Sequence, residues 1–160
     1  MSAIRSLTLV VRRTIRATPE RLFEAWTRPD QLQKWWGPKS VTCIAAEVDL
    51  KVGGRYRIAN QFPDGNILWI AGEFEIIERP RKLAYTWALE PQNKRPPDQG
   101  DRPESDAGPS ERVVVTFEAR GPDTEVIVTH ERILNPAMRD RHEQGWFGCL
   151  EGLEEYLRSR

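Results

Sequence analysis

The chain has 160 residues, of which 39% are hydrophobic and 30% are charged, values typical of one soluble globular domain with a core of its own. Its 24 lysines and arginines balance its 24 aspartates and glutamates, so no net charge attracts nucleic acid or an anionic membrane, and we expect neither as a partner. Without a membrane-length apolar run or a signal peptide, and with only the isolated cysteines Cys43 and Cys149, we expect a cytoplasmic protein with free thiols.

The first third of the chain predicts a strand followed by two short helices. Apolar residues alternate over Leu7–Ile15, which is typical of a strand. Thr18-Pro19-Glu20 then offers an N-cap, a first-turn proline and an acidic first-turn residue for a helix. Arg28-Pro29-Asp30 ends that helix, and we expect Asp30 to cap a second one that stops at Gly37-Pro38.

Six further strands follow, and most of them are joined by short turns. Hairpin turns are indicated at 63–66 and 121–123, and hairpin-length connections make the sheet antiparallel. The segment 91–110 is rich in proline and charge, and we expect a mobile loop there that could gate a binding site. The predicted strands are Val41–Leu50, Arg55–Gln61, Ile67–Glu78, Lys82–Leu89, Glu111–Ala119 and Thr124–Ile133.

The chain ends in a predicted amphipathic helix over Asn135–Arg158, whose apolar face includes His142, Trp146, Cys149 and Leu153. Gly145 and Gly152 border that face, although a glycine inside a helix costs about 1 kcal/mol relative to alanine. The helix therefore either packs closely against the sheet at these glycines or leaves room beneath them. One long helix covering one face of an antiparallel sheet places the chain in the α+β class.

Short motifs recur in order along residues 7–157. They are Ala17-Thr18-Pro19-Glu20, Trp35-Trp36-Gly37-Pro38, Gly53-Gly54, Pro63-Asp64-Gly65, Arg79-Pro80-Arg81-Lys82-Leu83, Thr129-His130-Glu131 and Gly145-Trp146. Their order and spacing resemble the START-like (SRPBCC) superfamily, and within it the AHSA type, the activator-of-heat-shock-protein-ATPase homologues that include calicheamicin-resistance-like proteins.

This resemblance implies the helix-grip (START/Bet v-like) fold. In that fold a seven-stranded antiparallel sheet wraps around a long C-terminal helix, with two short helices after the first strand. The resemblance also implies a ligand cavity between the sheet and the last helix. We expect residues 1–160 to form a single domain of this type.

The inward strand positions and the apolar face of the last helix supply candidate ligand contacts. They could instead fill a packed core, and Trp69 stands on a strand where Leu68 and Ile70 have the opposite parity. One residue of the Trp35-Trp36 pair is expected to staple the short helix to the sheet, and the other could roof the pocket. The candidates are Trp36, Tyr56, Ile58, Trp69, Tyr85, Trp87, Val115, Phe117, Val128, His130, His142, Trp146, Cys149 and Leu153.

The two histidines of the chain, His130 and His142, could approach the same gap between sheet and helix. His130 shares an inward strand face with Val126 and Val128, and His142 lies one turn before Trp146 on the last helix. Each could act as an acid, a base or a ligand anchor, or could simply fix the packing as a buried, hydrogen-bonded group. Two histidines and one thiol are too few for a metal site, so we expect no metal and no cofactor.

Three functions remain open at this point. We favour the binding of a hydrophobic or aromatic small molecule, with His130, His142 or Tyr85 orienting its polar groups. The resemblance also implies an enzyme of the cyclase, dehydratase or hydrolase type in the same cavity, although the chain carries no nucleophile or phosphate-binding motif. A chaperone-ATPase-activating partner is the least favoured. Phe147, on the polar side of the last helix, offers a contact for a partner or a homodimer.

Overall fold

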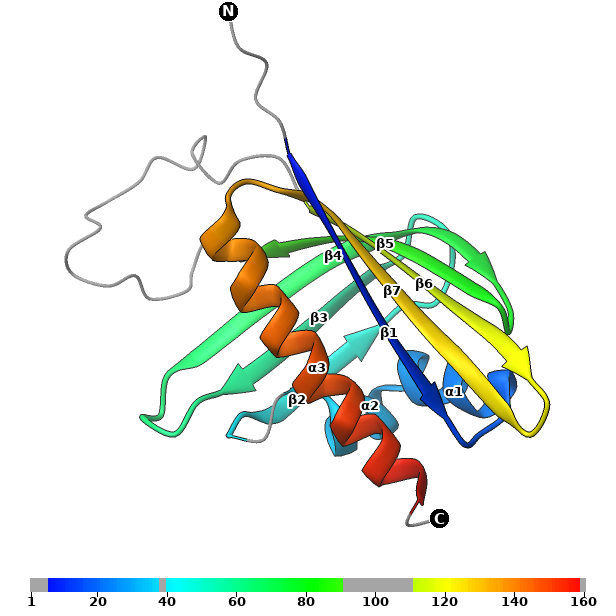
Figure 1. Ribbon diagram of the computed structural model, residues 1–160. Helices are drawn as coiled ribbons and strands as arrows, with labels where there is room; N and C mark the ends of the chain where they lie inside the picture. The colour runs from blue at the N-terminus through cyan, green and yellow to red at the C-terminus, as the bar shows by residue number, and fades with distance from the viewer. Residues whose placement is uncertain (1–5, 38–39, 91–110, 159–160) are drawn as a thin grey trace, which may run out of the picture.

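The computed structural model describes residues 6–37, 40–90 and 111–158, and the loop expected at 91–110 lies outside them. A strand, two helices, six strands and a long helix follow one another, as expected (Figure 1). The elements are β1 (Leu7–Ile15), α1 (Pro19–Thr27), α2 (Pro29–Trp35), β2 (Thr42–Val48), β3 (Arg55–Gln61), β4 (Ile67–Glu78), β5 (Lys82–Leu89), β6 (Glu111–Arg120), β7 (Asp123–Ile133) and α3 (Pro136–Arg158).

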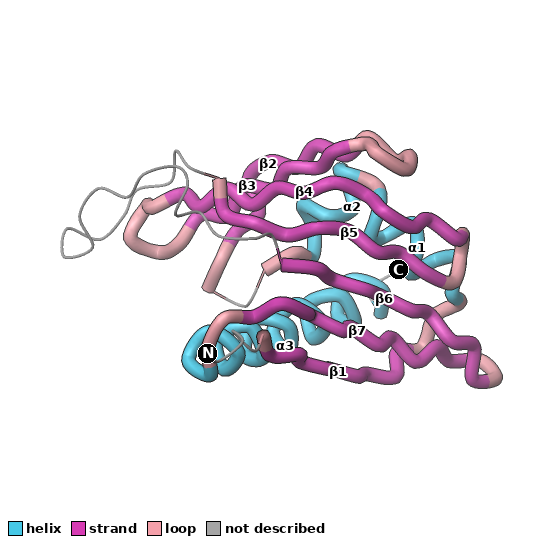
Figure 2. Tube along the Cα trace, turned by 90° about the horizontal axis from the view of Figure 1, so that it is seen from above, coloured by secondary structure: helices cyan, strands magenta, loops and turns pink. Residues whose placement is uncertain are grey.

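The seven strands form one antiparallel sheet in the order β1-β7-β6-β5-β4-β3-β2. β2 to β7 follow one another as a meander, and β1 closes the other edge by pairing with β7. Figure 2 shows the sheet curling around α3, while α1 and α2 lie on the same side of the sheet. This arrangement confirms the expected helix-grip fold and leaves the space between sheet and α3 as the interior of the molecule.

A bulge at the end of β7 follows directly after His130. Pairing shifts from Leu9↔His130 to Leu7↔Ile133, and Arg132 between them has a φ of 66°. Strict alternation would bury Arg132, but the extra residue turns it outward and sends Ile133 into the core. The bulge therefore keeps the apolar face of β7 continuous beyond the histidine.

The first two helices begin at their prolines. Thr18 Oγ1 accepts the N–H of Arg21 at 3.1 Å, which is the N-cap expected for α1. The expected cap of α2 by Asp30 is wrong, because Arg28 is the N-cap and Pro29 is the first helical residue. Proline suits that position, since its φ is already helical and its missing N–H would have no partner there. Asp30 still lies in the first turn, where a negative charge is favourable.

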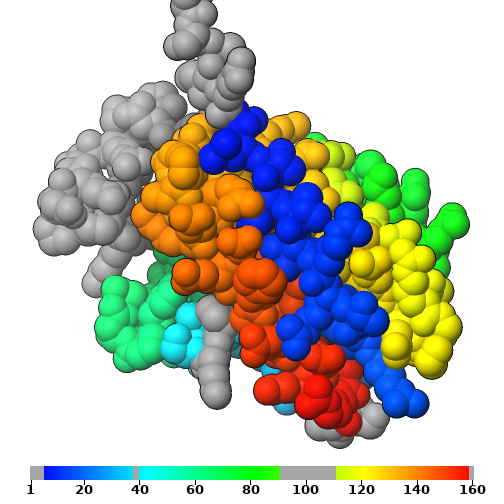
Figure 3. Space-filling model, viewed as in Figure 1, coloured from blue at the N-terminus to red at the C-terminus, as the bar shows by residue number. Residues whose placement is uncertain are grey.

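α3 covers the concave face of the sheet and is fixed along β1. Leu150 and Leu153 are fully buried beneath it, and Arg13 of β1 donates from Nε and Nη2 to Glu154 Oε1 at 3.1 and 2.7 Å. In the space-filling view α3 and β1 lie directly side by side (Figure 3). Within the described ranges, no helix has the length and apolar character needed to cross a membrane.

Candidate functional site

The space between the sheet and α3 is filled at one end and hollow at the other. At the filled end a void of about 20 Å³ remains among Trp26, Tyr56, Phe74 and Tyr85, which is about the room that one water needs. At the other end a pocket of about 140 Å³ opens beside His142. Since a cavity of about 150 Å³ can hold a benzene molecule, the second of these two spaces has room for a small ligand and the first does not. It is lined by Trp36, Gly37, Asn60, Leu68, Ile70, Trp87, His130, Arg141, His142, Gly145, Trp146 and Cys149.

Trp26 of α1 lies at the centre of the filled end. Its ring is stacked on Trp146 with centroids 6.0 Å apart and lies 5.0 Å from Trp35, while its Nε1 donates to the Tyr85 hydroxyl at 3.3 Å. Trp35 donates its own Nε1–H to the carbonyl of Ala25 at 2.8 Å, so this bond holds α2 to α1, whereas the sequence predicted a contact with the sheet. Burial raises the pKa of Tyr85, so its phenol stays neutral. This end is packed core.

Two of the three glycines of α3, Gly145 and Gly152, lie at different ends of this space. A Cβ added at Gly152 would lie 2.8 Å from the Trp35 carbonyl oxygen, so glycine is needed there for close approach to the end of α2. A Cβ added at Gly145 would meet nothing within 4 Å. Gly145 lines the 140 Å³ pocket, so the missing side chain leaves room there.

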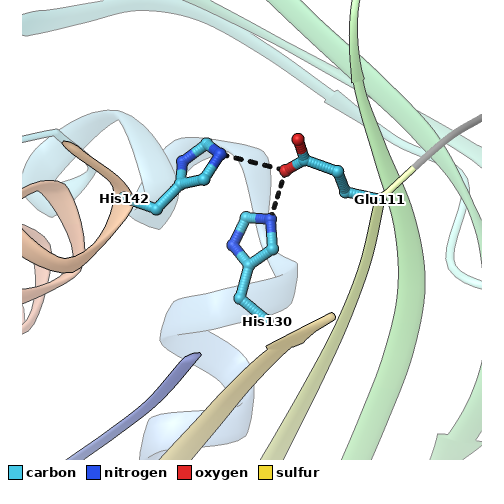
Figure 4. Close-up of side chains that lie close together, drawn as sticks. All are labelled: Glu111, His130 and His142. Carbon is cyan, nitrogen blue, oxygen red and sulfur yellow. Dashed lines mark hydrogen bonds and ion pairs between the residues drawn. The ribbon is translucent and has the colours of Figure 1, made fainter. Parts of the chain in front are cut away.

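Two histidines of the pocket lining, His130 and His142, lie against a buried carboxylate, that of Glu111 (Figure 4). Glu111, the first residue of β6, is 7% exposed, and its Oε1 lies 2.6 Å from His130 Nε2. Trp146 donates its Nε1–H to His130 Nδ1 at 3.0 Å. An indole can only donate, so Nδ1 of His130 carries no proton and Nε2 donates to Glu111. His130 is therefore neutral between a donor and an acceptor.

His142 approaches the same carboxylate from α3. Its ring stacks on His130 with centroids 4.3 Å apart and meets the Trp87 ring edge-on at 5.1 Å. Its Nε2 lies 3.0 Å from Glu111 Oε1, but this buried nitrogen has no hydrogen-bond partner of suitable geometry. The two atoms are therefore close together without a well-aligned hydrogen bond.

The cluster keeps Glu111 ionised and His130 neutral. Burial opposes the charge on Glu111, but the hydrogen bond from His130 and the proximity of both imidazoles outweigh it and lower the pKa of Glu111. Burial lowers the pKa of His130, and the bond to Glu111 only partly opposes that shift. One negative charge is thus held beside the pocket at neutral pH.

The three side chains Glu111, His130 and His142 bring potential ligand atoms within 4.8 Å of one another, so a metal ion must be considered. A histidine that binds a metal through Nε2 keeps its proton on Nδ1 and donates it to an acceptor. At His130 that position faces the N–H of Trp146, which is itself a donor. Two donors would then face each other, and the hydrogen bonding of His130 does not suit a metal.

The sequence-predicted contacts fall into three groups. Trp36, Trp87, His130, His142, Trp146 and Cys149 line the 140 Å³ pocket. Tyr56, Ile58 and Tyr85 line the small void, which Trp36 also reaches. Val115, Phe117, Val128 and Leu153 are buried in the core and line neither space.

The prediction that Trp69 faces the interior is wrong. Its neighbours Leu68 and Ile70 line the pocket, so alternation turns Trp69 to the other face of the sheet. There the guanidinium of Arg57 lies 4.1 Å from the centre of its ring. The cation–π contact with Arg57 stabilises Trp69 on the outer face, while the aliphatic side chains of Leu68 and Ile70 take the inward positions.

Sequence reasoning missed several residues of the pocket lining and also Glu111, which lies behind the two histidines. Glu111 is in phase with the inward positions Val113 and Val115, and Asn60 is in phase with Ile58, so alternation would have placed both inside. Leu68 and Ile70 would have followed from the same rule applied to β4. Arg141, an exposed residue of α3, gave no signal in the sequence pattern.

Neither thiol is suited to attack a substrate. Burial raises the pKa of Cys149, which lines the pocket, to about 12 and that of Cys43 to about 11. Both cysteines are free. Nucleophilic chemistry by a thiolate is therefore disfavoured, and the reactive groups of the pocket are the two imidazoles, with the Glu111 carboxylate next to them.

A curled antiparallel sheet that grips a long helix over an internal pocket defines the helix-grip class of proteins. Residues 16–158 match the model of the family described as activator of Hsp90 ATPase homolog 1-like protein, and the chain belongs to that family. The family is known for ligand binding. No curated protein matches the chain significantly.

Solved structures share the fold at low sequence identity. The chain is similar to the AHSA1 protein of Silicibacter pomeroyi, with 22% identity and a TM-score of 0.78 over 95% of this chain and 98% of that one. It is also similar to the AHSA1-like protein of Aeromonas hydrophila, with 21% identity and a TM-score of 0.72 over 96% and 93% of the two chains. A protein of Nitrosomonas europaea matches at 22% identity with a TM-score of 0.75 over 96% and 95%.

Proposed function

We propose that the protein binds an aromatic or otherwise hydrophobic small molecule in the pocket beneath Gly145. The observation that carries this proposal is the pocket of about 140 Å³ at a position where α3 has no side chain. A ring placed there would lie against Trp87 and Trp146 and the aliphatic Leu68 and Ile70. Apolar burial would supply the affinity, and the few polar groups would set the orientation.

Native mass spectrometry of freshly purified protein tests this proposal. We expect a co-purifying small molecule in the wild type and its loss in Gly145→Leu, whose side chain would occupy the pocket. Glu151→Leu is the matched control, because it adds the same side chain on the exposed face of α3. A ligand retained in Gly145→Leu, or no binding of any aromatic compound by the wild type, would contradict the proposal.

An enzyme is the second candidate, and the Glu111 cluster is the observation in its favour. His142 is 17% exposed at the pocket and stands 3.0 Å from a carboxylate, an arrangement that suits proton transfer to or from a bound molecule. Such an enzyme would exchange the α-deuterons of a bound aryl ketone such as deuterated acetophenone for solvent protons. The exchange is expected to disappear in His142→Gln, and equal exchange in that variant would exclude His142 as the base.

We further propose that the protein is located in the cytoplasm, because both of its cysteines are buried and free of disulfide bonds. Activation of a chaperone ATPase, which the family's name describes, is the third alternative. Stimulation of the ATPase of a purified Hsp90-type chaperone by this protein would favour it over small-molecule binding.

A further inference from the structure

Two buried polar atoms without hydrogen-bond partners stand at the same pocket. Among the described residues, the buried side-chain atoms that lack a partner are Asn60 Oδ1 and His142 Nε2. Both residues line the 140 Å³ pocket, Asn60 from β3 and His142 from α3. Buried polar groups in native proteins are nearly always hydrogen-bonded, so an unpaired set confined to one pocket calls for a polar partner there, which water or a polar group of a ligand can supply.

Asn60 Oδ1 and His142 Nε2 need different hydrogen-bond partners. Asn60 Oδ1 is an acceptor and needs a donor. His142 Nε2 lies 3.0 Å from the ionised carboxylate of Glu111, which only accepts, so the proton is favoured on this nitrogen. Because its alignment with Glu111 is poor, this N–H can take a further acceptor. A hydroxyl group donates one hydrogen bond and accepts others through a single oxygen, and it is the smallest group that meets both needs.

The size, the aromatic lining and the charges of the pocket restrict the chemical class of the ligand further. The size of the pocket limits the ligand to about one six-membered ring, and Trp87 and Trp146 offer aromatic surface to it. A carboxylate on the ring would supply acceptors only and would add a second negative charge near Glu111. Among the described residues of the lining, Arg141, exposed on α3, is the cation that could favour such an anion.

We propose that the pocket selects a single-ring phenol, whose hydroxyl donates to Asn60 Oδ1 and accepts from His142 Nε2. This inference rests on the proposed function, since it names the chemistry of the ligand for the same site. It assigns Asn60 and His142 as the specificity-determining residues, and it assigns the apolar lining to general affinity for the ring.

Titration of the protein with toluene, phenol and benzoate, followed through the indole N–H resonances in NMR spectra, tests the inference. Phenol is expected to bind about tenfold more tightly than toluene, because its hydroxyl forms hydrogen bonds with the buried groups that toluene leaves unpaired. Benzoate is expected to bind more weakly than phenol. In Asn60→Leu the phenol preference is expected to vanish while toluene still binds. His142→Phe keeps the ring and removes the N–H, and is expected to reduce the preference.

Arg55→Leu is the matched control, because Arg55 lies on the same strand as Asn60 with its side chain exposed. It is expected to leave the ratio of phenol to toluene affinity unchanged. Equal affinities for phenol and toluene in the wild type, tighter binding of benzoate, or an unchanged phenol preference in Asn60→Leu would each overturn the inference and leave the proposed function standing. Failure of all three compounds to bind would overturn both.

Discussion

Glycine has opposite roles at the two ends of α3: it permits close packing at Gly152 and leaves open space at Gly145. Around Gly152 the missing side chain lets the helix approach the carbonyl of Trp35, whose ring packs against Trp26. Around Gly145, about two turns earlier, the missing side chain borders a pocket with unpaired polar atoms. The difference indicates that the aromatic end contributes to the stability of the fold. The other end is less stable because it contains an open pocket and buried polar atoms without hydrogen-bond partners.

The largest contrast is expected from truncating one side chain at each end. Trp26→Ala removes the ring at the centre of the aromatic cluster and is expected to destabilise the protein by about 3–5 kcal/mol. Leu68→Ala removes a side chain that already borders open space, and about 1 kcal/mol or less is expected. Urea unfolding of both variants measures the difference, and equal losses would contradict the division into a packed and an open end.

Substituting alanine at the two glycines sharpens the same contrast with a single methyl group. Gly152→Ala places Cβ against the Trp35 carbonyl oxygen and is expected to destabilise by about 1–3 kcal/mol. Gly145→Ala meets no neighbour, and it is expected to stabilise by about 0.5–1 kcal/mol through helix propensity. Thermal unfolding of the pair is the measurement. Effects of the same sign would show that both positions are packed or that both are open.

Lowering the pH is expected to reduce the stability contributed by His130 and Glu111 before it affects the aromatic cluster around Trp26. Because the fold lowers the pKa of His130 from 6.5, the unfolded chain takes up this proton first, and the contribution of neutral His130 to stability is lost as the pH falls from 6.5 through the folded pKa. The pKa of Glu111 is lowered from 4.5, so its contribution is present above pH 4.5 and is lost at lower pH. The free energy of unfolding should therefore decline on acidification.

His130→Gln separates this effect from the other titrations of the protein. Glutamine can donate to Glu111 and accept from Trp146, but it does not titrate. Urea unfolding as a function of pH is expected to show a shallower decline below about pH 6.5 in this variant than in the wild type. Parallel profiles would mean that His130 is not held neutral by its surroundings.

The smallest effect is expected from divalent metal ions. The N–H of Trp146 directed at His130 Nδ1 disfavours a metal at Nε2, so Zn²⁺ is expected to leave the melting temperature unchanged. A melting temperature that rises with Zn²⁺ concentration in the wild type but not in His142→Phe would contradict this account of the cluster.

Local patterns were sufficient for the order and bounds of the strands, whereas the helix-grip arrangement was implied by the family resemblance. Alternation and the turn residues at 63–66 and 121–123 predicted every strand to within two residues, because hairpins are specified by neighbours in the sequence. The cap of α2 was misplaced because Arg28 is a poor N-cap by residue type, and the proline that follows it determines where the helix begins.

The site could be predicted only in part. Alternation brought His130 and His142 to the same gap, but Glu111 was overlooked because acidic residues are common on strand faces and its partners are distant in the sequence. The parity of β4 argued against Trp69, whose aromatic character suggested the wrong face. Which part of the gap is filled depends on how Trp26, Trp35 and Tyr85 pack together, and no periodicity in one segment contains that information.

The central claim, that a ligand enters only at the Gly145 end, is tested most directly by titrating the protein with toluene and following each tryptophan indole N–H by NMR. Saturable shifts are expected at Trp87 and Trp146, which line the pocket. The indoles of Trp35, in the packed core, and Trp69, on the outer face, are expected to remain unchanged. Saturable shifts at Trp35 or Trp69 without shifts at Trp87 and Trp146, or no shift at any indole, would contradict the account.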